Sequence, residues 1–118
     1  FIRWLDGVAS LARAVVGGYE YDLMKALAPF ERDKEGLSRA LERLCLIWRD
    51  VSVRKSGGET MLSGADELCD LLAGKLSFDG CLRLQEVCRD AQLKLTGNLS
   101  GPLLITWLSG HLRGAVLL

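Results

Sequence analysis

Residues 33–55 read DKEGLSRALERLCLIWRDVSVRK, and this segment decides the fold. Its apolar residues recur at spacings of three and four over about five turns, which is the period of an amphipathic helix. At about 100° per residue, the main stripe falls within roughly 40° of one line; it consists of Leu37, Leu41, Leu44, Trp48 and Val51. Ala40, Cys45 and Ile47 widen this face to about 160°. A face this wide needs cover on both flanks, so we expect a central helix within a bundle.

Two apolar side chains of the central helix lie away from this stripe. Leu46 and Val53 stand about 160–180° from Leu37 around the helix axis. Charged residues of both signs surround them, namely Arg39, Glu42, Arg43, Arg49 and Asp50. One interpretation is scattered surface apolar residues, which are common in folded proteins. The other is a second amphipathic surface that contacts another protein chain.

Composition indicates one globular domain. The 118 residues are 49% apolar and 25% charged, an ordinary balance for a chain that buries a single core. Net charge is +2 up to Gly58 and −2 beyond it, too mild to indicate a nucleic-acid or membrane surface. No apolar run approaches the roughly 18–20 residues of a membrane span. Because the chain opens at Phe1 already in a helical pattern, we expect a fragment of a longer polypeptide.

The cysteines do not form a metal-binding pattern. They stand at positions 45, 69, 81 and 88 without a CxxC pair, and His111 lies far along the chain. We therefore expect four free thiols that behave as small buried hydrophobic residues, a reducing cytoplasmic location, and no cofactor or metal.

The remaining sequence predicts further helices and no strand, giving an all-α bundle of five or six helices. The first two helices are expected over residues 2–16, with Trp4 and Val8 on the buried face, and over residues 19–28 before Pro29. A fourth is expected over residues 65–76. A fifth begins after the N-cap Ser77 and runs to about residue 95, and the last begins at Pro102 and ends near residue 114.

The fifth and last predicted helices carry wide apolar faces. That of the fifth comprises Phe78, Cys81, Leu84, Cys88, Ala91 and Leu95. Gln85 and Gln92 fall within it, and because buried glutamines need partners, they either bond inside the bundle or line a junction with another chain. The face of the last helix comprises Leu103, Leu104, Ile105, Trp107, Leu108 and Leu112. His111 lies inside that face and is expected to be a packing residue.

Motifs of catalysis are missing from the sequence. It contains no phosphate-binding GxxxxGK[ST] loop, no nucleophile elbow and no paired carboxylates on an apolar face. Arg54 and Lys55 could form a DNA-binding patch, but their place in the last turn of the central helix favours interaction with the helix dipole. We expect no enzymatic activity in this segment.

Several segments together resemble one family. Residues 41–50, LERLCLIWRD, resemble an "LL-x-LL-x-WLRD" stretch in the C-terminal domain of the bacterial DNA polymerase III delta prime subunit, and the basic end and Gly57-Gly58 turn also match. Residues 84–95 followed by GNLS resemble that family's "L-x-x-N-V-N" helix end, and Leu103, Leu108 and Leu112 match its closing helix. The resemblance spans residues 4–112, with Ser100-Gly101 in place of the usual Asn-Pro.

The resemblance implies a role in DNA replication. Delta prime belongs to the clamp loader, the ATP-driven part of the polymerase holoenzyme that places the sliding clamp on primed DNA. The resemblance implies that residues 1–118 are its helical collar domain alone, without the N-terminal AAA+ domains. The partners would be the gamma/tau and delta subunits, with DNA reached only through the complex and no membrane involved. The alternatives are a gamma/tau collar domain, or an unrelated helical adaptor or nucleic-acid-binding bundle.

Residues that the core does not need are the candidates for the subunit interface. These are Leu46, Val53, Gln85, Gln92 and Trp107. Leu46 and Val53 combine an apolar centre with a charged surround, the usual anatomy of a protein interface.

Overall fold

The computed structural model describes residues 5–17, 19–58, 66–97 and 99–118. Six α-helices and one short 3-10 helix make up most of these residues, and no strand occurs among them. The elements are α1 (Leu5–Val16), α2 (Glu20–Leu27), η1 (Ala28–Phe30), α3 (Lys34–Lys55), α4 (Asp66–Ala73), α5 (Phe78–Leu95) and α6 (Gly101–Val116). The predicted all-α class is confirmed, and the predicted contribution of Trp4 lies outside the described residues.

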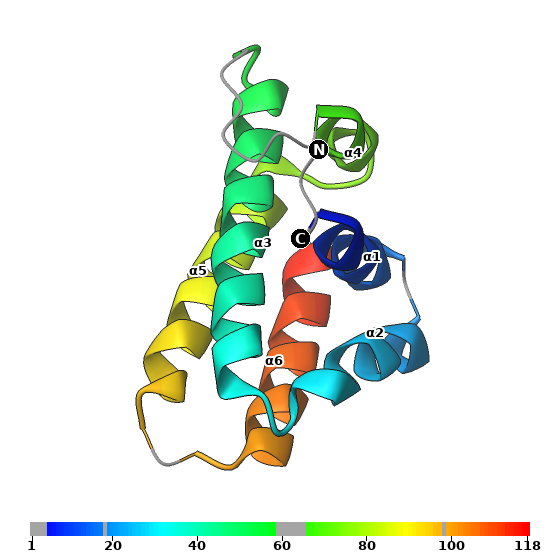
Figure 1. Cartoon of the computed structure of the whole chain (residues 1–118). Coiled ribbons are helices and arrows are strands. Elements are labelled where there is room, and N and C mark those ends of the chain that lie inside the picture. Colours follow the sequence, from blue (N-terminus) through cyan, green and yellow to red (C-terminus); the bar gives the residue numbers. More distant parts are fainter. Residues whose placement is uncertain (1–4, 18, 59–65, 98) are drawn as a thin grey trace.

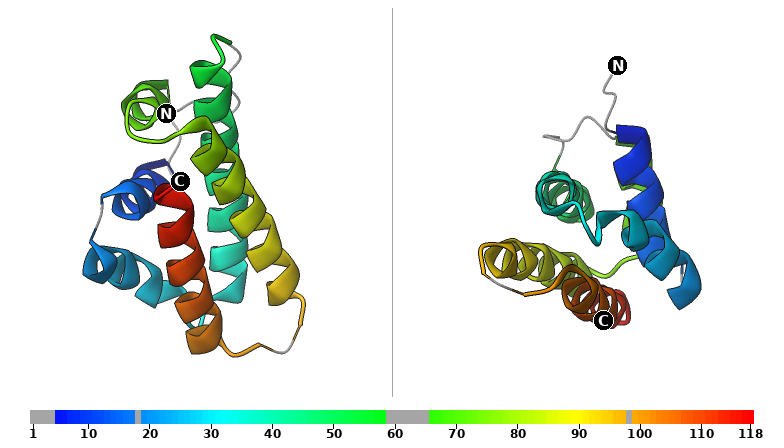
Figure 2. Two further views of the ribbon diagram at one scale, coloured as in Figure 1. Left: turned by 180° about the vertical axis from the view of Figure 1, so that it is seen from behind. Right: turned by 60° about the horizontal axis from the view of Figure 1, so that its bottom comes forward.

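The helices form a ring around the core (Figure 1). α3 packs against α5, α5 against α6, α6 against α2 and α1, and α1 returns to α3. α4 packs beside the C-terminal half of α3, and Figure 2 shows the same neighbours from behind. α3 is therefore covered on both flanks, as its wide apolar face predicts. The ring order differs from the chain order, since α4 lies outside the ring and α6 packs against α1 and α2.

Side-chain caps begin the long helices. The Asp33 carboxylate accepts from the backbone N–H of Gly36 at 2.9 Å, and the Ser77 hydroxyl accepts from that of Gly80 at 2.9 Å. Each bond satisfies a backbone donor that has no partner within its helix. The predicted cap at Ser77 is confirmed.

A glycine turn ends α3. Gly57 has a φ of +83°, a conformation that side chains disfavour, and its N–H bonds to the carbonyl of Arg54 at 3.1 Å. The N–H of Gly58 bonds to the carbonyl of Val53 at 2.9 Å. This pair of bonds is the Schellman motif, so Gly57-Gly58 stops the helix as predicted.

The core contains the residues that the helical pattern places inside. Five residues of the predicted apolar faces, and Leu72 of α4 with them, were expected in the core and are buried; the five are Leu41, Leu44, Trp48, Leu84 and Cys88. Gly80 is also buried, and a Cβ there would lie 3.1 Å from the carbonyl oxygen of Ala115. The glycine inside α5 therefore permits close approach of α6.

Three residues depart from the predicted pattern. Asp50, expected on the charged outer face, is fully buried and forms an ion pair with Arg49 at 3.0 Å. The reason is that the part of α3 from residue 47 to residue 52 is covered around most of its circumference, since Ile47, Trp48, Val51 and Ser52 are buried as well. Phe78 and Leu103, expected inside, are 43% and 61% exposed, because each lies in the first turn of its helix at an end of the bundle.

Candidate functional site

A groove between α3 and α5 brings together three of the five interface candidates. Leu46 comes from α3, and Gln85 and Gln92 come from α5. The groove has a volume of about 360 Å³ and is completed by Glu42, Cys45, Arg49 and Arg89. These seven residues are called the α3/α5 groove below.

Helical spacing explains how the two walls form. Gln85, Arg89 and Gln92 are four and three residues apart, so they share one face of α5. Leu46 follows the stripe residues Leu44 and Cys45 along α3 and is partly exposed at the margin of the core. The groove therefore runs along the seam between the two most extensively packed helices.

Both glutamines bond within the chain while lining the groove. Gln85 is 7% exposed; its Nε2 donates to the carbonyl of Cys81 at 3.4 Å, and its Oε1 accepts from Arg89 at 3.3 Å. Nε2 of Gln92 donates across the seam to the carbonyl of Ser38 at 3.4 Å. These bonds are longer than the usual 2.9–3.0 Å, so a partner chain could compete for the amides at small cost.

The electrostatics of the groove follow the interface pattern. Leu46 and Cys45 supply apolar surface, and the Cys45 thiol lies 4.0 Å from the carbonyl of Gln85. Glu42 and the two arginines supply charges of both signs at the sides. An apolar centre with a polar rim suits a protein surface better than a small charged ligand.

Val53 and Trp107 lie outside this groove. Val53 is partly buried, and its Cγ1 packs where a side chain on Gly58 would be, so it supports the turn that ends α3. Trp107 lies on α6, in hollows that it shares with residues of α5 such as Arg83 and Asp90. The structure thus places three of the five candidates in the α3/α5 groove, Val53 at the turn that ends α3, and Trp107 on α6.

Trp107 and His111 form a stacked pair on α6. Their ring centroids are 4.3 Å apart with an interplanar angle of 25°, and Lys94 Nζ lies 4.9 Å from the Trp107 ring centroid. His111 is partly exposed rather than enclosed in the core, and its Nδ1 lies 2.8 Å from the carbonyl oxygen of Trp107. The spacing of four residues between two rings on one helix is the signal that could have revealed this pair from the sequence.

All four cysteines are free thiols, and the buried ones are poor nucleophiles. Burial, and secondarily the neighbouring Cys45, raise the pKa of Cys88 to about 12, although Trp48 and Arg89 act in the opposite direction. Burial also raises the pKa of Cys81, against a smaller lowering effect of Lys55. A thiol that stays protonated is a weak nucleophile, which suits Cys81 and Cys88 to packing in the core.

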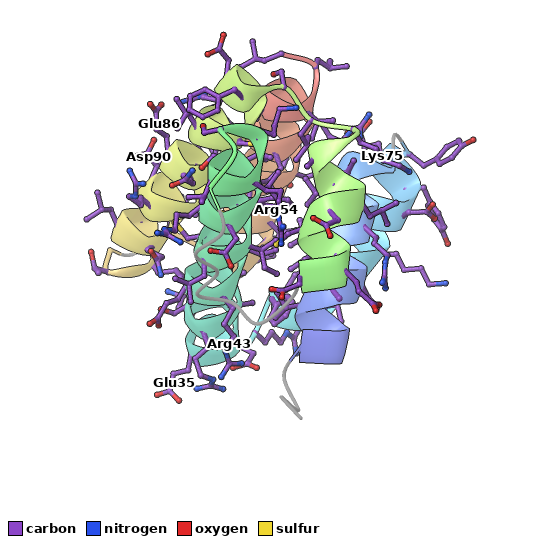
Figure 3. The ribbon with its side chains drawn as sticks, turned by 90° about the horizontal axis from the view of Figure 1, so that it is seen from above. Glu35, Arg43, Arg54, Lys75, Glu86 and Asp90 are labelled. Atoms are coloured by element: carbon purple, nitrogen blue, oxygen red, sulfur yellow. The ribbon has the colours of Figure 1, made fainter. Side chains whose placement is uncertain are left out.

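The basic end of α3 is occupied by contacts with α4. Arg54 Nε lies 3.0 Å from a carboxylate oxygen of Asp70, and Lys55 Nζ donates to the carbonyl of Ala73 at 3.0 Å. Figure 3 shows Arg54 between α3 and α4. These contacts attach α4 to the bundle, which argues against a DNA-binding patch.

The described ranges contain neither a cluster of metal ligands nor a helix suited to cross a membrane. Within residues 5–17, 19–58, 66–97 and 99–118, no group of three His, Cys, Asp or Glu side chains is placed to hold a metal ion. None of the helices in these ranges has the length and apolar character needed to cross a bilayer.

No protein-family model, curated protein or solved structure matches the chain. The functional interpretation therefore depends on the surface of the bundle and on the resemblance of its segments.

Proposed function

We propose that this chain is a helical protein-interaction domain that serves as the collar domain of a clamp loader subunit of the delta prime type. In this role it holds neighbouring subunits together in the cytoplasm during sliding-clamp loading and catalyses no reaction itself. Two features support the proposal: the family-like segments lie on α3, α5 and α6, and a groove along α3 and α5 has interface character.

The observation that carries the proposal is the position of Leu46. It lies on α3 among the residues of the family-like segment, yet it is partly exposed and lines the α3/α5 groove. Glu42 and Arg49, four residues before it and three after it, share its side of the helix. An apolar side chain that the core leaves partly exposed, between charges of opposite sign, is a suitable anchor for a partner helix.

Contact at the groove would combine apolar and polar interactions. An apolar side chain of the partner would bury Leu46 and Cys45, and its polar groups would take bonds from Gln85 and Gln92. The partners on this proposal are the gamma/tau and delta collar domains. Because hot spots are few and central, Leu46 should contribute more than any single charge at the rim.

The test uses Leu46→Glu, with Leu71→Glu as the matched control. Leu71 lies on α4 outside the groove and is 48% exposed, so it receives the same charge at a different surface. Both variants should keep the helical circular dichroism of the parent. Only Leu46→Glu should weaken the affinity for the gamma/tau and delta collar domains, as measured by sedimentation. The loss should be tenfold or more for a hot spot of about 2 kcal/mol.

Three results would count against the proposal. An unfolded Leu46→Glu variant would assign Leu46 to the core, and normal assembly would place the contact elsewhere. Binding of duplex DNA by the isolated chain, with a steep loss of affinity as salt rises, would favour the nucleic-acid-binding alternative.

A further inference from the structure

A second unpartnered surface lies on the other flank of α5, along α6. Its exposed and partly exposed residues carry no formal charge and include three large apolar side chains; they are Leu103, Thr106, Trp107, Gly110, Gly114 and Leu117. Leu103 and Leu117 are 61% and 80% exposed. The one Lys or Arg of α6, Arg113, donates to the carbonyl of Val15 on α1 at 3.2 Å. A 16-residue helix that leaves an uncharged face uncovered is a candidate for docking.

A line of charges on α5 borders this uncharged face. At about 100° per residue, Asp79, Arg83, Asp90 and Lys94 fall within roughly 60° of one another around α5. Arg83 lines the hollow that contains Gly114, and Asp90 and Lys94 line the hollow that contains Trp107. Glu86 lies on the same side of α5, so the charges along this side run minus, plus, minus, minus, plus from Asp79 to Lys94. α5 itself lies beside α6 (Figure 2).

We infer that this surface, defined as the α6 face together with the four charges on α5, binds a second copy of the same chain about a two-fold axis at Gly110. In a two-fold contact of this kind, α6 of one copy packs antiparallel against α6 of the other copy. Each residue of α5 then faces the α5 residue of the second copy that lies equally far from the axis, on the opposite side of it. With the axis level with residues 86 and 87, Arg83 faces Asp90 of the second copy, and Asp79 faces its Lys94.

Charge order selects a second copy as the occupant. Four pairs of opposite charge form by symmetry, two of each kind. A two-fold axis parallel to α6 would instead put the second copy's α5 on the other flank of α6, where none of these pairs forms. Glu86 falls close to the axis, where its copies would repel one another. However, it already forms an ion pair with Arg83 at 2.9 Å, and Figure 3 shows it projecting from α5 together with Asp90.

The centre of the contact is free of steric obstruction. A Cβ added at Gly110 would have no atom of its own chain within 4 Å, so the backbone there is open to close approach. Sixteen helical residues extend about 24 Å, and two adjacent helices make a face about 20 Å wide. A contact of this size lies at the lower end of specific interfaces, so we expect a dimer with a dissociation constant of about 1–100 µM.

This surface is separate from the α3/α5 groove. The groove residues Gln85, Arg89 and Gln92 lie roughly 140° around α5 from the line of charges. Self-association can therefore occur with the groove free, and it goes beyond the proposed collar function.

The experiment is sedimentation equilibrium of the chain from about 1 to 500 µM, a range that brackets the expected affinity. The parent should pass from monomer to dimer without larger species. Arg83→Asp alone and Asp90→Arg alone should each weaken the dimer about five- to tenfold, because each turns two attractive pairs into repulsive ones. The double variant Arg83→Asp/Asp90→Arg exchanges the charges and should restore the parent affinity within about twofold.

Two further variants test the axis and the independence of the two surfaces. Gly110→Arg should abolish the dimer, because two arginines would meet at the axis, while the replacement of a helical glycine should not unfold the chain. Leu46→Glu should dimerise like the parent. A chain that stays monomeric at 500 µM, a double variant that fails to recover, or a Gly110→Arg variant that still dimerises would overturn the inference.

Discussion

Replacement of Trp48 by alanine should be among the most destabilising single substitutions in this chain. Trp48 is fully buried among the residues of α3 that face the core, so no neighbouring loop can close the space that it leaves. Large aromatic residues truncated to alanine in a core cost about 3–5 kcal/mol of unfolding free energy. With an unfolding entropy of about 2.1 cal/mol/K per residue, this cost lowers Tm by about 12–20 °C. Thermal and urea denaturation followed by circular dichroism would measure both quantities.

Two control variants separate packing from side-chain chemistry. Trp107→Ala removes the same side chain from a partly exposed site and should cost about 1 kcal/mol, the strength of an exposed stacking and cation–π contact. Trp48→Phe keeps most of the volume and the apolar contacts of the ring, so it should be much milder than Trp48→Ala. A loss below about 1 kcal/mol for Trp48→Ala would refute the assignment of Trp48 to the core.

Two other predictions concern glycine substitution and alkaline stability. Gly101→Ala should destabilise the chain strongly, because the added Cβ would collide with the backbone carbonyl of Glu31, whereas Gly110→Ala meets no atom and should stabilise the helix by about 0.5–1 kcal/mol in urea titrations. The contribution of the Cys88 thiol to the free energy of unfolding should be fully present below pH 9, the ordinary Cys pKa. It should fall as pH rises toward 12, because this thiol ionises far more easily in the unfolded chain. Cys88→Ala should lose part of this alkaline dependence in denaturation series from pH 8 to 11; an unchanged slope would contradict the burial of the thiol.

The helices and the core could be predicted because they depend on local pattern. The stripe from Leu37 to Val51 has one consistent period, and residues that cap or break a helix mark its ends, such as Ser77 at the start of α5 and Gly57 after α3. Asp50 shows the limit of this reasoning. A helical projection gives the direction of a side chain but not how far neighbouring elements extend around it, and α3 is enclosed more completely near its C-terminal end than its own pattern indicates.

The candidate site could be predicted only in part, because it combines two helices. The pattern of α3 identified Leu46 as a residue outside the main stripe, and that of α5 identified Gln85 and Gln92 as polar residues on an apolar face. Their meeting in one groove depends on the register between α3 and α5, which no local pattern specifies. Val53 was grouped with Leu46 for the same reason: the helical pattern of α3 does not show that the turn at Gly58 covers Val53.

The order of helices around the ring has a consequence for how the chain folds. α3 packs against α4 and α5, and the bonds between α3 and α5 join residues 40 and 54 positions apart. α1 and α2 depend on α6 for much of their cover, and the bond from Arg113 to Val15 joins residues 98 positions apart. α1 and α2 pack on each other, and α1 packs on α3 as well, so α6 completes their cover rather than providing all of it. Closure of the ring thus depends on the most distant contacts along the chain, the kind that slows folding on topological grounds.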